Sequence, residues 1–172
     1  MKQGYFVTGI GTGVGKTVVA SALALAGDFD YWKPIQCGDL DDTDAQRVKR
    51  LTDHKVSIHA EIHKLNAPMS PHAAAATEGV RIDLNNFRLP PSERGLVVEG
   101  AGGILVPLND HETMLDLMDH LDLRVILVSM HYLGSINHTL LSIEILKSRQ
   151  IDVAGLIFVG DEHPTTEHAI AK

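Results

Sequence analysis

The sequence has almost no cysteine, since Cys37 is the single one among 172 residues. One cysteine cannot form an internal disulfide, and it cannot supply the several thiolates of a cysteine metal cage. The composition therefore excludes both devices, and it is typical of a protein kept in the reducing cytoplasm.

Long hydrophobic runs and an excess of positive charge are also missing. The first eight residues lack the apolar core and cleavage site of a signal peptide, and no apolar run reaches the length that spans a membrane. The 15 basic residues are outnumbered by 22 acidic ones, which gives a net charge of -7 at pH 7. We therefore expect a soluble cytoplasmic protein whose partners include neither nucleic acid nor a membrane.

What the sequence does contain is an alternation of short β-branched runs with longer helical segments. At about 150 residues per domain, the chain predicts a single domain over residues 1–172. The expected strands are residues 5–8, 31–35, 96–99, 125–129 and 153–159. The expected helices are residues 16–26, 44–51, 71–78, 113–121 and 135–149. This order predicts an α/β fold, a mostly parallel sheet with helices on both faces, whose ligand site lies at the C-terminal ends of the strands.

A glycine-rich loop joins the first expected strand to the first expected helix. It reads Gly-Ile-Gly-Thr-Gly-Val-Gly-Lys-Thr over residues 9–17. Glycines let successive backbone N–H groups point at phosphate oxygens, a lysine adds positive charge, and a hydroxyl can bind Mg²⁺. The loop predicts a P-loop NTPase, with five residues instead of the usual four before the final Gly-Lys-Thr. The predicted nucleotide-binding residues here are Thr12, Gly13, Val14, Gly15, Lys16 and Thr17.

Two other interpretations of this loop fit less well. A dinucleotide-binding fingerprint needs a third glycine where Lys16 stands. The partitioning type of P-loop ATPase carries a signature lysine where this chain has Gly11. A nucleotide triphosphate is the ligand that the loop favours.

Three charged residues follow or flank the expected strands. Lys33 precedes a proline, and it is either a solvated edge residue or aimed at the phosphate site. Glu99 ends an apolar strand, so it should meet a cation or a metal. Asp44 opens a helix, where it could simply stabilise the helix N-terminus.

Taken together, these segments resemble the ATP-dependent dethiobiotin synthetases, a family of the P-loop superfamily. The matching stretches run in family order over nearly the whole chain: residues 5–17, 33–34, 44–45, 70–72, 98–103 and 133–138. The resemblance implies an ATP-dependent cyclo-ligase of biotin biosynthesis. Its reaction converts 7,8-diaminopelargonate, CO2 (from bicarbonate) and MgATP to dethiobiotin, ADP and phosphate, through a carbamate and a carbamic-phosphoric anhydride.

The resemblance also assigns roles around the phosphates. It implies that Thr17, Asp44 and Glu99 hold Mg²⁺, and that Lys16 and Lys33 act in catalysis by offsetting the growing negative charge. Such a division of labour suits phosphoryl transfer, which depends on positioning and charge stabilisation. The nucleotide-binding set that it implies further includes Gly100, Ala101 and Gly102.

Substrate binding is expected at two places. Lys33 and Cys37 form one, and a helix N-terminus for the distant carboxylate forms the other. That helix begins with Gly134, Ser135, Ile136 and Asn137. In the family it reaches into the neighbouring subunit, so a homodimer with the site at its interface is implied. In the alternative interpretation, this helix binds no ligand, and Asn137 and His138 form a hydrogen-bonding pair in its first turn. His72 is likewise expected to be a packing or capping residue and not a catalytic base.

The chain departs from the family at its end. Members of the family commonly bind adenine with an Asn-Asp pair after the fifth strand, whereas this chain has Phe-Val-Gly-Asp at residues 158–161. Members of the family also continue beyond the position of Lys172. We expect either a truncated chain, which would lack the family's C-terminal segment, or an incomplete base pocket. Two alternatives stay open: a nucleotide switch of the partitioning type, and a relative of the corrin amide ligases.

Overall fold

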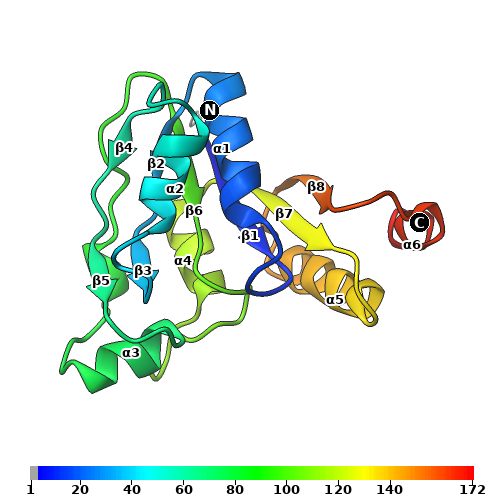
Figure 1. The fold of residues 1–172 in the computed structure, drawn as a ribbon. Coiled ribbons are helices and arrows are strands. Elements are labelled where there is room, and N and C mark those ends of the chain that lie inside the picture. Colours follow the sequence, from blue (N-terminus) through cyan, green and yellow to red (C-terminus); the bar gives the residue numbers. More distant parts are fainter. Residues whose placement is uncertain (1–3) are drawn as a thin grey trace.

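The computed structural model describes residues 4–172 and contains one main parallel sheet. The strands are β1 (Gly4–Gly9), β2 (Asp30–Trp32), β3 (Ile35–Cys37), β4 (Ile58–His59), β5 (His63–Leu65), β6 (Leu96–Glu99), β7 (Arg124–Met130) and β8 (Val153–Val159). Six of them pair in the order β4-β2-β6-β1-β7-β8, and every pairing is parallel. The loop that follows β1 lies at the lower end of the sheet in Figure 1.

The helices match the expected segments closely. They are α1 (Lys16–Gly27), α2 (Asp44–Leu51), α3 (Pro71–Thr77), α4 (Met114–Leu121), α5 (Ser135–Ser148) and α6 (Pro164–Ile170), with a short 3₁₀ turn, η1 (Leu84–Asn86). The sequence did not predict α6, η1, β3, β4 or β5 as separate elements. None of the helices within residues 4–172 combines the length and hydrophobicity needed to cross a bilayer.

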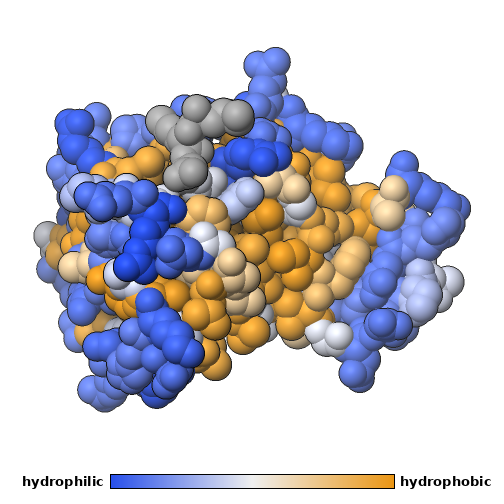
Figure 2. All heavy atoms as spheres, turned by 90° about the horizontal axis from the view of Figure 1, so that it is seen from above, coloured by the Kyte–Doolittle hydropathy of each residue, from blue (hydrophilic) through white to orange (hydrophobic). Residues whose placement is uncertain are grey.

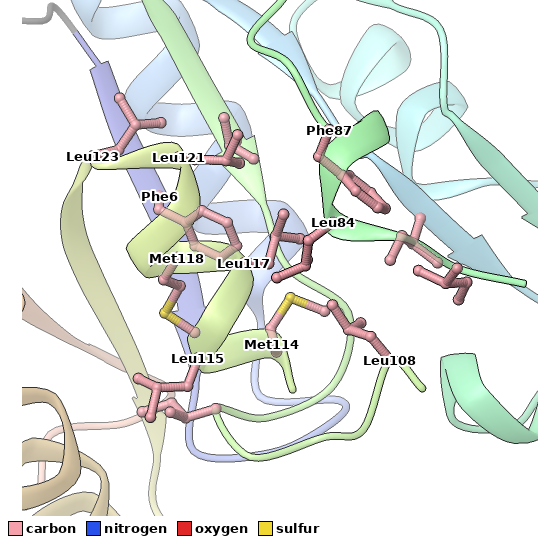
Figure 3. Packing of buried hydrophobic residues seen from close by; sticks show 14 of the residues in the cluster. Phe6, Leu84, Phe87, Leu108, Met114, Leu115, Leu117, Met118, Leu121 and Leu123 are labelled. Carbon is pink, nitrogen blue, oxygen red and sulfur yellow. The ribbon is translucent and has the colours of Figure 1, made fainter. Parts of the chain in front are cut away.

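Helices cover both faces of the sheet, as predicted. Side chains alternate between the faces of a strand, so Phe6 and Val7 of β1 enter different hydrophobic clusters. Phe6 packs with α4, and Figure 3 shows its ring close to Leu117 and Met118. Val7 lies in the cluster built from α1 and α2, which cover the opposite face. The α/β prediction is therefore confirmed.

The expected strand over residues 31–35 is wrong in one respect. The strand β2 ends at Trp32, and a new strand, β3, begins at Ile35. Pro34 has no N–H to continue the ladder, and its carbonyl accepts hydrogen bonds from the N–H groups of Ile62 and His63. The chain then enters β3, which pairs with β5 in a separate two-stranded sheet. The break lies beside Lys33 and directs the chain over the end of the main sheet.

Candidate active site

A cleft of about 620 Å³ opens at the C-terminal ends of β1, β2 and β6. Its walls come from the P-loop, from the segment around β3 and α2, from the glycine run after β6 and from the loop before α3. The lining residues are Thr12, Gly13, Gly15, Lys16, Thr17, Val18, Lys33, Gln36, Cys37, Asp39, Asp44, Arg47, Pro68, Met69, Ser70, Pro71, Glu99, Ala101, Gly102 and Val106. Most residues predicted for nucleotide, metal and catalysis therefore share one cavity.

The P-loop adopts a conformation that glycine allows. Gly13 and Gly15 have φ values of 75° and 93°, in the left-handed region. A Cβ on Gly15 would also lie 2.9 Å from the Val159 side chain. Gly15 caps α1 without a side-chain hydrogen bond, so no side chain competes with a phosphate for the first N–H groups of the helix. Val14 instead packs its side chain into the core, so only its backbone can serve a ligand.

Lys16 is buried beside this loop with few partners. Its Nζ donates to the Gly11 carbonyl at 2.7 Å. Burial lowers the pKa of Lys16 to about 8, although the charge of Glu99 acts in the opposite direction. An anionic ligand would restore the preference for the charged form, which is the behaviour expected of a phosphate-binding lysine.

Lys33 lies between two carboxylates and is not a solvated edge residue. Its side chain is 5% exposed, and Nζ is 2.5 Å from Asp44 Oδ2 and 3.1 Å from Glu99 Oε1. Burial alone would lower the pKa of Lys33, but the negative charges of Glu99 and Asp44 outweigh it and raise the pKa. The ammonium therefore stays charged at the centre of the cleft.

The two carboxylates meet the P-loop through Thr17. Its hydroxyl donates to Glu99 Oε1 at 2.9 Å, and the same hydroxyl also lies close enough to Asp44 to help lower the pKa of that carboxyl. Burial opposes that lowering, and the charge of Lys33 overcomes it. Asp44 is not the cap of α2, because Thr43 and Gln46 form a reciprocal capping box there. Its carboxylate instead lines the cleft, where Lys33 and Arg47 contact it.

These three residues form a donor set that fits Mg²⁺. A hydroxyl and two carboxylates supply only oxygen, the element that this hard cation prefers. Mg²⁺ in nucleotide sites typically takes one or two carboxylates and completes its shell with water and phosphate oxygens. Thr17, Asp44 and Glu99 lie where such a shell would meet the P-loop.

The glycine run after β6 has two roles. Gly100 packs against the core, where a Cβ would lie 2.9 Å from the ring of Phe6, and its N–H donates to the Val7 carbonyl. Gly102 has a φ of 68° and lines the cleft with Ala101. The next glycine, Gly103, lies against the P-loop, because a Cβ there would be 3.6 Å from the backbone of Gly11.

The predicted substrate residues divide between two places. Cys37 lines the cleft, and burial raises the pKa of its thiol to about 11, so the thiol is neutral at physiological pH. Residues 134–137 do not line the cleft of their own chain. They begin α5 beside the exposed Leu133, and His138 pairs with the Tyr132 hydroxyl at 2.8 Å.

Several lining residues escaped the sequence analysis. Arg47 contacts Asp39, Asp42 and Asp44, and its three-residue spacing from Asp44 on α2 was a signal that could have found it. Gln36 is buried and accepts from the N–H of Asp44 at 3.3 Å, which no sequence spacing announces.

His72, which the sequence analysis expected to be a packing or capping residue, does not line the cleft. It is exposed and pairs with the Ser70 hydroxyl at 3.0 Å.

Comparison with known proteins agrees with this geometry. A family model described as an AAA domain matches residues 3–172. The structure of a ParA family ATPase from Chlorobium tepidum has a TM-score of 0.51 at 15% identity, and the match covers all of this chain and 82% of that one. That likeness concerns the fold alone. The chain has the fold and the phosphate loop of a P-loop ATPase.

The curated relatives narrow the class further. The ATP-dependent dethiobiotin synthetase of Christiangramia forsetii is 58% identical, over all of this chain and 83% of the relative. That of Paramagnetospirillum magneticum is 46% identical, over 98% of this chain and 82% of the relative. The chain belongs to the dethiobiotin synthetase family, and the partitioning-type switch and the amide ligase are not favoured.

Proposed function

We propose that this chain closes the ureido ring of dethiobiotin from 7,8-diaminopelargonate, CO2 and ATP, in the cytoplasm. The observation that carries the proposal is the position of Lys33, whose ammonium lies between Asp44 and Glu99 in the same cleft as the P-loop. A fixed positive charge beside a phosphate loop is what a reaction between ATP and a carboxylate-like acceptor needs.

The reaction begins when one amine of the substrate adds to CO2 and loses a proton, which forms a carbamate. A carbamate oxygen then attacks the γ-phosphorus of ATP, and ADP leaves. The second amine attacks the carbamoyl carbon of this mixed anhydride and gives up one proton, phosphate leaves and takes up a proton, and the ring closes. Each step moves negative charge onto oxygens near the Lys16 and Lys33 ammonium groups, which stabilise it.

Other residues of the cleft position the reactants. The backbone of residues 13–17 would hold the β- and γ-phosphates, with the Thr12 hydroxyl beside the same oxygens. Mg²⁺, held by Thr17, Asp44 and Glu99, would neutralise phosphate charge during transfer. Cys37, Met69 and Pro68 give the opposite wall an apolar lining, which suits the carbon chain of the diamine.

We also propose that the active unit is a homodimer. The N-terminus of α5 lies outside its own cleft, and apolar side chains are exposed around it. These are Leu133, Ile136, Leu140 and Leu141. A second copy packed there would cover these side chains and bring residues 134–137 to the partner's cleft, where the helix N-terminus suits the substrate carboxylate.

Phosphate release with systematic omission tests the proposed reaction. The protein is incubated with MgATP, the diamine and bicarbonate, each is omitted in turn, and the product is identified by mass. We expect phosphate release to require all three and to accompany dethiobiotin in equal amounts. ATP binding with no effect of the diamine would refute the assignment.

A further inference from the structure

The hydroxyl of Tyr31 contacts a carboxylate of the cleft from the side of the core. Tyr31 is the middle residue of β2 and is fully buried. Its hydroxyl donates to Glu99 Oε2 at 2.8 Å. The other oxygen of the same carboxylate, Oε1, accepts from Thr17 and Lys33. Glu99 therefore presents one oxygen to the cleft and one to a buried phenol.

We propose that Tyr31 is a positioning residue, whose hydroxyl fixes the rotation of the Glu99 carboxylate so that Oε1 faces the metal ion bound with the nucleotide. This inference rests on the proposed function, in which Glu99 is a ligand of Mg²⁺. Hydrogen bonds behind a ligating carboxylate orient it, and their loss typically weakens metal binding 10- to 100-fold.

The surroundings of Tyr31 keep its hydroxyl in one place. Its ring belongs to the hydrophobic cluster beneath α1 and α2, and its backbone pairs with Val97, two residues before Glu99 on β6. Burial and the charge of Glu99 both raise the pKa of Tyr31 well above its usual value. The hydroxyl therefore remains protonated at neutral pH and continues to donate.

A purely structural tyrosine would behave differently from a positioning one. Without the hydroxyl, Oε2 of the 1%-exposed Glu99 loses its donor, and the carboxylate becomes free to rotate. That freedom weakens a metal site. A structural role would lower the stability of the fold and leave metal affinity unchanged.

The test compares Tyr31→Phe with Tyr5→Phe, measuring the dissociation constant of Mn²⁺ by electron paramagnetic resonance at saturating ADP. Tyr5 undergoes the same chemical change on β1, level with Tyr31 on the other side of β6, but its hydroxyl contacts Arg124 instead of Glu99. We expect Tyr31→Phe to weaken Mn²⁺ binding about tenfold or more. Tyr5→Phe should stay within twofold of wild type, and ADP affinity without metal should be unchanged in both.

Two non-natural residues separate the hydrogen bond from the packing, and they also serve if Tyr31→Phe fails to fold. Replacing Tyr31 by 4-aminophenylalanine keeps a donor at the same place, whereas 4-methylphenylalanine fills the space without one. We expect the first to bind Mn²⁺ within threefold of wild type and the second about tenfold more weakly.

Equal Mn²⁺ affinity in the two replacements, or wild-type affinity in folded Tyr31→Phe, overturns the proposal. A wild-type protein that binds no Mn²⁺ with ADP overturns both this role and the metal site of the proposed function. Wild-type protein that binds Mn²⁺ but forms no dethiobiotin contradicts only the proposed reaction.

Discussion

Two sides of the sheet, the one around β6 and the one at the edge strand β8, differ in how completely their residues are buried. All four residues of β6 are buried, and the charged groups beside this strand are paired with one another. Every residue of β8 is only partly buried, and α5 exposes apolar side chains. Figure 2 shows hydrophobic residues gathered on the side of the molecule next to the projecting α6.

This difference separates the cleft of the proposed reaction from the apolar surface that the proposed homodimer would bury. Charges can be held close together at low exposure only where the surrounding packing is complete, because an unpaired buried charge is very costly. The side with β8 carries no such cluster among residues 4–172, and its apolar surface is the face that the proposed homodimer would cover. Four predictions test how far the two sides are independent.

The largest effect is expected from Lys33→Ala. It removes the positive charge of the cleft and leaves Asp44 and Glu99 facing each other. Turnover should fall about 100- to 1000-fold, and the free energy of unfolding by about 3–5 kcal/mol. Steady-state phosphate release and denaturant unfolding measure the two losses. Lys64→Ala, on an exposed lysine of β5, is the control, and wild-type turnover in Lys33→Ala would remove this residue from the mechanism.

The same substitution on neighbouring strands compares the packing of the edge strand β8 with that of β7, the strand beside it. Ile126 of β7 is 7% exposed, whereas Ile157 of β8 is only partly buried in the same cluster. Ile126→Ala should lower the free energy of unfolding by about 2–5 kcal/mol, and Ile157→Ala by about 1 kcal/mol. Denaturant titration of both variants measures this, and equal losses would show that the two strands are equally packed in solution.

A charge on α5 tests assembly without touching the cleft. Leu141 is 61% exposed, and Leu141→Glu should shift the proposed dimer to a monomer in sedimentation experiments. Turnover should fall at least tenfold, while ATP binding to the P-loop stays unchanged. Leu51→Glu, on Leu51 of α2, which is 56% exposed, is the control and should leave the dimer intact. A dimer that survives Leu141→Glu would place the interface elsewhere.

The smallest effect concerns the buried lysine of the P-loop. The pKa of Lys16 in the folded protein, about 8, lies below its ordinary 10.5, so the unfolded chain binds this proton more tightly. Between these values the contribution of Lys16 to stability rises with pH. Relative to Lys16→Met, nucleotide-free wild type should gain about 1–2 kcal/mol from pH 7.5 to pH 9.5. A flat or falling difference in denaturant titrations would contradict this.

Local signals predicted most of the fold. The loop over residues 9–17, the apolar runs and the helical segments each lie within a few neighbouring residues, so a pattern can reveal them. The strands β4 and β5 escaped because two or three residues are too short to show an alternation. The end of β2 at Trp32 follows from Pro34, which has no N–H to donate to the ladder, whereas the expected strand ran one residue beyond this proline.

Contacts between distant residues were harder to predict. The motif residues Lys33 and Glu99 meet across 66 positions, and only the resemblance brought them together beforehand. Tyr31 carries no motif, and its bond to Glu99 depends on β2 and β6 being neighbours, which the order along the chain does not state. The place proposed for residues 134–137 depends on the second copy of the proposed homodimer, which one chain does not contain.

In the proposed reaction, the ion pairs of Lys33 also affect the entropy of catalysis. A free lysine side chain samples many rotamers, and fixing it costs about 1.5–2 kcal/mol. In this protein Asp44 and Glu99 already restrain that side chain before any reactant arrives. The loss of disorder is thus incurred when the chain folds, and it is absent from the activation barrier of each turnover.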